Sequence, residues 1–146
     1  MLVMNGGKDI VLNTEGHGVM RFPTSKLSLE GGTLSLEDLE TIPDQKNDSY
    51  SPTCLFADEK KTILTIMSYS ETDKKLKIER RKANENYIPD GEVYSVECPH
   101  TIMKACMDYK RLQLQILDIM GNASIFDIED QKILSKHPNC TGILAI

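Results

Sequence analysis

Two short pairs of cysteine and histidine are the residues whose types and spacing could support metal chemistry. One proline separates Cys98 from His100, and a proline and an asparagine separate His137 from Cys140. Both residue types are zinc ligands, and two such pairs brought together would supply a tetrahedral site. The spacings differ from those of known zinc modules, and each pair lies where a proline interrupts the chain. We therefore predict no metal site and no cofactor.

Cys98 is also a candidate nucleophile. The sequence predicts a helix that begins after Cys98 and Pro99, and the positive end of a helix dipole lowers the pKa of a nearby thiol. A cysteine enzyme also needs a histidine base and an orienting acid. No family signature surrounds any of the four cysteines. We predict that the protein is not an enzyme, with a zinc- or cysteine-dependent enzyme as a remaining alternative.

The most informative polar feature is a basic run at residues 73–82, which holds six basic and two acidic residues in a chain of net charge −5. If Leu76 and Ile78 point inward on a strand, alternate side chains line the opposite face. The predicted exposed edge surface consists of Lys75, Lys77, Arg81 and Lys82. It could bind phosphates of a nucleic acid or of another phosphorylated ligand, or it could protect an edge strand from pairing with other chains. The run lacks interleaved stacking aromatics, so we expect no specific nucleic-acid binding.

Residues 101–120 are predicted to form the long helix around which the chain is organised. Pro99 suits the first turn of a helix and Gly121 suits its end. Two apolar lines follow helical spacing. The first line contains Ile102, Ala105, Tyr109, Leu112, Ile116 and Ile119, and the second contains Met103, Met107, Leu114 and Leu117. Two apolar lines require two neighbours, so the second line is predicted to bind either a shorter helix at residues 124–137 or a second copy of the chain.

The first two-thirds of the chain predict strands separated by turns. Residues 8–12 and 19–22 flank a glycine turn, residues 62–67 and 76–78 flank a polar turn, and residues 93–96 form a further strand. Residues 26–36 predict another hairpin, although Ser35 and Asp38 could instead cap a short helix at residues 36–39. The polar segment 43–52 predicts an exposed loop.

The predicted fold class is α+β. It has a mainly antiparallel sheet, then the long helix, the shorter helix, and a short terminal strand at residues 142–146. A length of 146 residues predicts one domain, residues 1–146.

Composition limits the function classes. The chain is 40% hydrophobic and 27% charged, as in globular domains, and no apolar run reaches the length of a membrane span. Its four cysteines lack a disulfide framework, which predicts reduced thiols and a cytoplasmic location. We therefore predict a non-enzymatic protein-interaction domain (an adaptor, regulator or inhibitor), either monomeric or homodimeric, with no membrane contact. The alternative is a nucleic-acid or phosphorylated-ligand module that uses residues 73–82.

Overall fold

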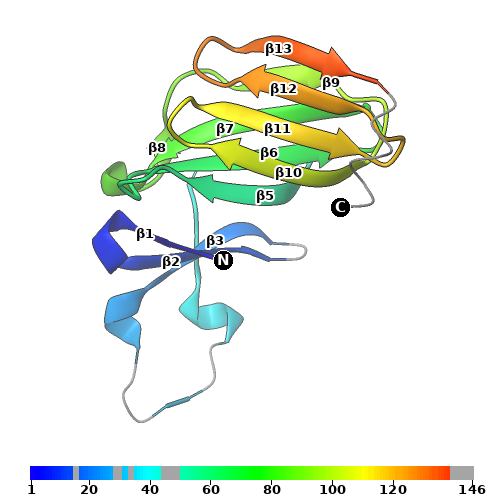
Figure 1. The fold of residues 1–146 in the computed structure, drawn as a ribbon. Helices are drawn as coiled ribbons and strands as arrows, with labels where there is room; N and C mark the ends of the chain where they lie inside the picture. Colours follow the sequence, from blue (N-terminus) through cyan, green and yellow to red (C-terminus); the bar gives the residue numbers. More distant parts are fainter. Residues whose placement is uncertain (15–16, 28–30, 33–34, 44–49, 139–146) are drawn as a thin grey trace.

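The computed structural model describes residues 1–14, 17–27, 31–32, 35–43 and 50–138. Within these ranges the chain forms three sheets, and all strand pairs are antiparallel (Figure 1). In each sheet the strands pair in the order in which they occur along the chain, except that β9 pairs with β7.

The first sheet contains β1 (Leu2–Met4), β2 (Asp9–Thr14), β3 (Gly18–Pro23) and β4 (Glu40–Thr41). The second contains β5 (Ser51–Ala57), β6 (Ile63–Ser70), β7 (Lys75–Lys82), β8 (Ile88–Pro89) and β9 (Tyr94–Glu97). The third contains β10 (Ile102–Asp108), β11 (Gln113–Asp118), β12 (Ala123–Asp127) and β13 (Lys132–His137). The helical segments are the short 3-10 turns η1 (Asn5–Gly7), η2 (Thr24–Lys26), η3 (Leu36–Asp38) and η4 (Ala83–Glu85).

The prediction of an α+β fold with a long helix is wrong. Residues 101–120 contain the hairpin β10–β11, and the segment predicted as the shorter helix contains β12 and β13. The chain reverses between β10 and β11 because the Asp108 carboxylate accepts hydrogen bonds from the backbone N–H groups of Lys110 and Arg111, at 3.1 and 3.2 Å. Leu112 completes this turn in the left-handed conformation, with φ of 52°.

Aspartates make the other two turns of the third sheet in a similar way. The Asp118 carboxylate accepts hydrogen bonds from the backbone N–H groups of Met120 and Asn122, both at 2.9 Å. The carboxylate of Asp127 accepts one from the N–H of Asp130 at 2.8 Å. A carboxylate that satisfies backbone donors just ahead of it stabilises a tight turn, and in the turn after Asp118 Gly121 also takes the left-handed conformation, with φ of 83°. These three aspartates therefore set the lengths of the four strands of the third sheet.

Several predictions for the first two-thirds are confirmed. The glycine-turn hairpin is β2–β3, the polar-turn hairpin is β6–β7, and the predicted strand at residues 93–96 overlaps β9. Ser35 donates its backbone N–H and its hydroxyl to the Asp38 carboxylate at 3.0 and 3.2 Å at the start of η3, and a short helix therefore forms at Leu36–Asp38.

Three predictions fall wholly or partly outside the described residues. The competing hairpin at residues 26–36 includes residues 28–30 and 33–34, and the terminal strand at residues 142–146 lies beyond residue 138. The loop predicted at residues 43–52 includes residues 44–49, and its last two residues belong to β5.

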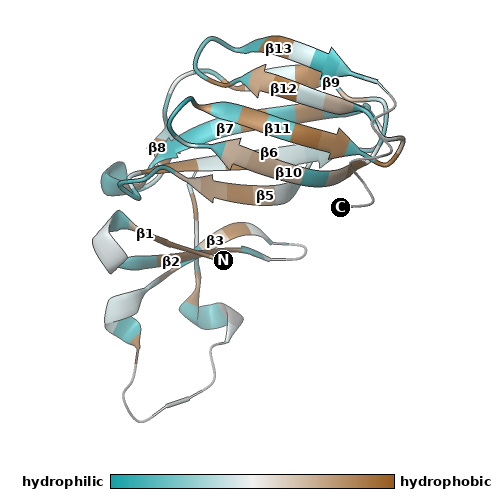
Figure 2. Cartoon of the chain, in the orientation of Figure 1, coloured by the Kyte–Doolittle hydropathy of each residue, from teal (hydrophilic) through white to brown (hydrophobic). Residues whose placement is uncertain are grey.

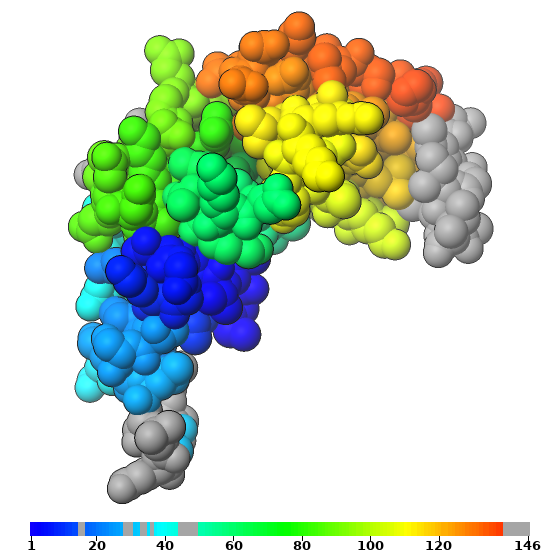
Figure 3. Space-filling model, turned by 60° about the vertical axis from the view of Figure 1, so that its left-hand side comes forward, coloured from blue at the N-terminus to red at the C-terminus, as the bar shows by residue number. Residues whose placement is uncertain are grey.

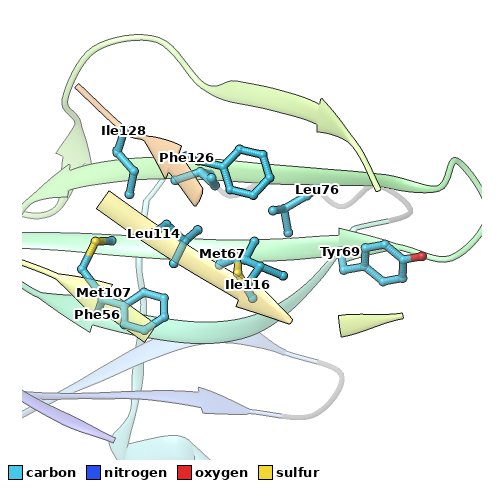
Figure 4. Packing of buried hydrophobic residues seen from close by; sticks show 10 residues of the cluster. Phe56, Met67, Tyr69, Leu76, Met107, Leu114, Ile116, Phe126 and Ile128 are labelled. Carbon is cyan, nitrogen blue, oxygen red and sulfur yellow. The ribbon is translucent and has the colours of Figure 1, made fainter. Parts of the chain in front are cut away.

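Two apolar cores join the three sheets in series. The core between the first and second sheets contains Met4, Val11, Val19, Ile42, Ala57, Leu64, Ile66, Ala83 and Tyr87. The core between the second and third sheets contains Phe56, Met67, Tyr69, Leu76, Ile78, Met107, Leu114, Ile116, Phe126 and Ile128 (Figure 4). Figure 2 shows the apolar residues spread along the strands of all three sheets. The second sheet is therefore covered on both faces, which requires apolar side chains on both faces of its strands.

The three sheets follow one another along an arc, from the first through the second to the third (Figure 3). Neighbouring blades of β-propellers are four-stranded antiparallel sheets that pack face to face, whereas in the described part of this chain the three sheets have four, five and four strands. Each sheet occupies one continuous stretch of sequence, at residues 2–41, 51–97 and 102–137. The three sheets thus pack in series in the order in which they occur in the sequence.

Candidate interaction surfaces

The third sheet has a second face, which points away from the second sheet. Because side chains alternate along a strand, the neighbours of the core residues Leu114, Ile116 and Phe126 point to this side. They form two rows across the sheet: Lys104, Leu117, Ala123 and His137, and then Cys106, Gln115, Ile125 and Ser135. These eight residues are called the outer face below.

A hollow of about 540 Å³ lies on the outer face, and residues of all four strands line it. Leu117, Ala123 and Ile125 give it an aliphatic character, while the exposed Cys106 and Gln115 bring in one thiol and one amide. Hollows of this volume accept a small molecule or several side chains of a partner. Lys104, Ser124 and His137 also line the hollow, so it combines aliphatic contact surface with groups that can form hydrogen bonds.

The strand β11 has a buried apolar residue on each face of the third sheet. Ile116 and Leu117 are adjacent and point to opposite faces, yet they are only 5% and 9% exposed. Leu114 points to the same side as Ile116 and is fully buried. A sheet with one face in water normally alternates apolar and polar residues along its strands. Gln113 and Gln115 share the outer face with Leu117, so β11 follows this alternation except at Leu117.

The structure separates the four binding residues predicted on the second apolar line. Met107 and Leu114 are buried in the core between the second and third sheets, while Met103 is 48% exposed at an irregularity in the β10–β11 register. Of the four, Leu117 lies on the outer face. The sequence analysis missed Cys106 and Ile125, which an alternating pattern would have placed beside it.

The strand β7 carries the four basic residues predicted as an exposed edge, and that edge position is wrong. β7 pairs with β6 along its whole length, and with β8 and β9 on its other side. Lys75 and Lys82 pair with the carboxylates of Glu97 and Glu85, at 3.8 and 3.5 Å. The ammonium group of Lys77 lies 4.8 Å from the centre of the Tyr50 ring. These cations are partly neutralised by neighbours within the chain.

Arg81, the fourth of these basic residues, is only 1% exposed and has a structural position. Its Nη1 donates hydrogen bonds to the backbone oxygens of Pro43 and Tyr87 at 2.5 and 3.2 Å, and its Nη2 pairs with the Glu79 carboxylate at 3.4 Å. A buried guanidinium requires such partners because its desolvation is costly. Arg81 therefore holds the backbone near β4 and η4 against β7 and does not face a ligand.

A polar junction lies beside Arg81, between the first and second sheets. The Tyr87 hydroxyl donates a hydrogen bond of 2.8 Å to the Asp9 carboxylate. The guanidinium of Arg21 lies 5.7 Å from the centre of the Tyr87 ring and pairs with Glu40 at 2.9 Å. Burial first, and then the hydrogen bond and the charge of Asp9, raise the pKa of Tyr87 far above its ordinary value. Because Tyr87 is fully buried, these contacts fix the packing of the first sheet on the second.

The cysteine and histidine candidates do not form an activated pair within the described residues. Cys98 follows β9, and its Sγ donates to the backbone oxygen of His100 at 3.4 Å. Burial, and then the negative charge of Asp118, raise the pKa of the Cys98 thiol. The predicted helix whose dipole would lower this pKa does not form.

His137 lines the hollow, and Cys140 lies outside the described residues. No cluster of three or more potential metal ligands occurs in the part of the chain that the structure describes.

The chain matches no family model and no curated protein. Among the described residues, none of the helices has the length and apolar character needed to cross a membrane.

Proposed function

We propose that the chain is a non-enzymatic protein-interaction domain of the cytoplasm, and that it binds its partner through the outer face. One observation carries this proposal: the outer face contains a hollow of about 540 Å³, which is lined in part by the aliphatic side chains of Leu117, Ala123 and Ile125. Apolar surface that is removed from water on binding contributes roughly 25 cal/mol for each Å². Contiguous exposed apolar surface is typical of interaction sites.

The state of the Cys98 thiol supports a non-enzymatic reading. A cysteine nucleophile needs a lowered pKa and a base within reach. Burial instead raises the pKa of Cys98, and its Sγ donates to a backbone oxygen. The cytoplasmic location is proposed because the four cysteines lack a disulfide framework.

The surroundings of β7 give less support to nucleic-acid binding. Arg81 is buried, and Lys75 and Lys82 pair with carboxylates of the same chain. A phosphate would have to compete with these partners. Binding of single-stranded RNA and duplex DNA, followed by fluorescence anisotropy at increasing salt, tests this alternative. Tight binding that weakens steeply with salt would favour it over the proposal.

A random peptide library displayed on phage provides the direct test of the outer face, because the partner need not be known. We expect the purified chain to select peptides with apolar anchors. Their binding should be lost in the variant Gln115→Arg, which places a charge at an exposed position on the outer face.

The matched control is Val93→Lys, at a residue that is 47% exposed and precedes β9. This variant should bind the selected peptides as the unmodified chain does. Peptides that bind both variants equally would show that the outer face is not the contact surface.

A further inference from the structure

We infer that the partner of the outer face is a protein segment with an acidic residue beside its apolar anchor. Its carboxylate binds the ammonium group of Lys104, and its apolar side chain fills the hollow over Leu117 and Ile125. This inference rests on the proposed function and names the chemistry of the partner. It follows from the way in which charged, polar and aliphatic groups are arranged around the hollow.

The hollow has an aliphatic centre and polar surroundings. Leu117 and Ile125 lie on the central strands β11 and β12, where Leu117 is buried and Ile125 is half-buried. Lys104 and His137 lie on the outer strands β10 and β13 and are exposed, and Gln115 adds an exposed amide on β11. Protein interfaces often have such an apolar centre inside a polar rim. A partner that fits the hollow therefore supplies an apolar side chain and, close to it, a polar group.

Lys104 gives the hollow an uncompensated positive charge. Within the described residues Lys104 forms no ion pair, whereas Lys75 and Lys82 pair with carboxylates at 3.8 and 3.5 Å. None of the described residues that line the hollow is an aspartate or a glutamate. Complementary charge steers a partner and sets its register, so a carboxylate is the group that the Lys104 side of the hollow attracts.

Two carboxylates lie beyond the other end of the hollow. The register places Asp108 and Asp127 on the outer face, one row past Cys106 and Gln115. Lys104 and Asp108 are four residues apart on β10, which is roughly 13 Å along the strand, and the screening length is about 8 Å at physiological salt. The positive and negative parts of the outer face therefore act separately, and the carboxylate of the partner lies at the Lys104 end.

A single carboxylate suits this hollow better than a phosphate does. Phosphate-binding sites of proteins typically use arginines, which form two parallel hydrogen bonds to the phosphate oxygens. Among the described residues that line the hollow, none is an arginine and Lys104 is the only lysine. One positive charge beside an aliphatic floor thus matches one carboxylate beside an apolar side chain.

The geometry of the sheet sets the spacing within the partner segment. Leu117 and Ala123 follow Lys104 in one row across the sheet. Because neighbouring strands lie about 4.8 Å apart, these two residues are about 5 and 10 Å from Lys104. Side chains two positions apart in an extended segment point to the same side and lie roughly 7 Å apart. We therefore expect the acidic residue two positions away from the apolar anchor.

The random peptide library, selected on the unmodified chain, tests the inference together with the variant Lys104→Glu. We expect the selected peptides to carry aspartate or glutamate two positions from an apolar residue. In fluorescence anisotropy, the synthetic peptides should bind Lys104→Glu about three- to tenfold more weakly than the unmodified chain, because repulsion replaces an exposed ion pair. Added salt should weaken their binding to the unmodified chain. Peptides in which lysine replaces the acidic residue should bind Lys104→Glu more tightly than they bind the unmodified chain.

Lys60→Glu is the matched control, because it makes the same change in net charge at an exposed residue between β5 and β6. The neighbouring Lys61 accepts a hydrogen bond of 2.8 Å from the backbone N–H of Asn5, so this turn lies beside η1 and away from the outer face. Lys60→Glu should bind the selected peptides as the unmodified chain does. Circular dichroism and urea unfolding check that each variant folds. If Lys104→Glu does not fold, Lys104→Gln replaces it and should weaken binding by up to about fivefold.

The possible results separate this inference from the proposed function. Selected peptides without an excess of acidic residues, or with equal affinity for Lys104→Glu and the unmodified chain, would overturn the acidic partner. Equal weakening by Lys60→Glu would show that only net charge matters, and it would refute binding at Lys104. In each of these cases the proposed function stands if Gln115→Arg, whose larger side chain occupies the hollow, abolishes binding. Peptides that bind Gln115→Arg as they bind the unmodified chain would contradict the proposed function itself.

Discussion

Removing the hydroxyl of Tyr87 tests the polar junction that joins the first and second sheets. Tyr87→Phe keeps the aromatic ring, its burial and its contact with Arg21, and it deletes the 2.8 Å hydrogen bond to the Asp9 carboxylate. A hydrogen bond to a charged group contributes roughly 1.5–3 kcal/mol when both groups are buried. Asp9 is 4% exposed and retains Arg21 at 3.8 Å. We therefore expect a loss of about 1.5–3 kcal/mol in the free energy of unfolding.

Urea unfolding at pH 7, followed by circular dichroism, measures this loss. A loss of that size should lower the melting temperature by roughly 3–12 °C for a chain of this length. Tyr109→Phe is the matched control, because Tyr109 is 41% exposed, and it should change the free energy of unfolding by less than about 0.5 kcal/mol. Equal stability of the unmodified chain and Tyr87→Phe would show that the junction does not hold the two sheets together.

The pKa of Tyr87 adds a dependence on pH. This pKa is raised in the folded chain, whereas an unfolded tyrosine has a pKa of about 10. Above pH 10 the unfolded chain loses the Tyr87 proton and the folded chain keeps it, so folding loses roughly 1.4 kcal/mol of stability per pH unit. Below pH 10 this contribution is fully present. The difference between the unmodified chain and Tyr87→Phe should thus narrow above pH 10, and a constant difference up to pH 11.5 would refute the burial of the neutral phenol.

Three further outcomes are expected. Leu114→Ala should lower the free energy of unfolding by about 2–5 kcal/mol, because the Leu114 side chain is fully buried between two sheets. Leu112→Ala should lower it by less than about 1 kcal/mol, because Leu112 lies half-buried in a turn. Similar urea midpoints for these two variants would contradict the β10–β11 hairpin. In urea unfolding, Arg81→Glu should abolish the cooperative transition or lower the free energy of unfolding by at least about 3 kcal/mol. Lys75→Glu, at a half-exposed position, should change the free energy of unfolding by less than about 1 kcal/mol. In a variant with Cys106 as the sole cysteine, Ellman's reagent should react with the dilute folded chain about as fast as with the unfolded chain, and a slow reaction would show that the outer face is covered.

The wrong prediction for residues 101–120 has a definite physical origin. Twelve of these twenty residues are apolar, so a helical period and an alternating period both find matches. The alternation of Leu114 and Ile116 around the polar Gln115 was the better guide. Asp108, Asp118 and Asp127 follow one another at intervals of ten and nine residues. Turn residues at intervals of 8–12 are typical of all-β proteins, and that spacing could have identified the third sheet.

The hairpins β2–β3 and β6–β7 were predictable because their turns contain glycine or a run of polar residues. The position of β7 inside its sheet was not. It depends on β8 and β9, which return to β7 from later in the sequence, and a charged strand looks the same in sequence at an edge or in the middle. The burial of Arg81 likewise depends on Pro43, which lies 38 residues away along the chain. Contacts of this range leave no local pattern.

The two faces of the third sheet differ in composition. The inner face packs on the second sheet with large apolar side chains such as Leu114, Ile116 and Phe126. The outer face mixes Leu117 and Ile125 with exposed polar residues. Interfaces that never separate are more apolar than the rest of a protein surface, whereas a surface that also meets water must keep polar groups. This composition favours a partner that associates reversibly. Binding to the outer face should therefore be reversed by dilution, and a partner that dissociates only when the chain unfolds would show that the outer face is buried permanently.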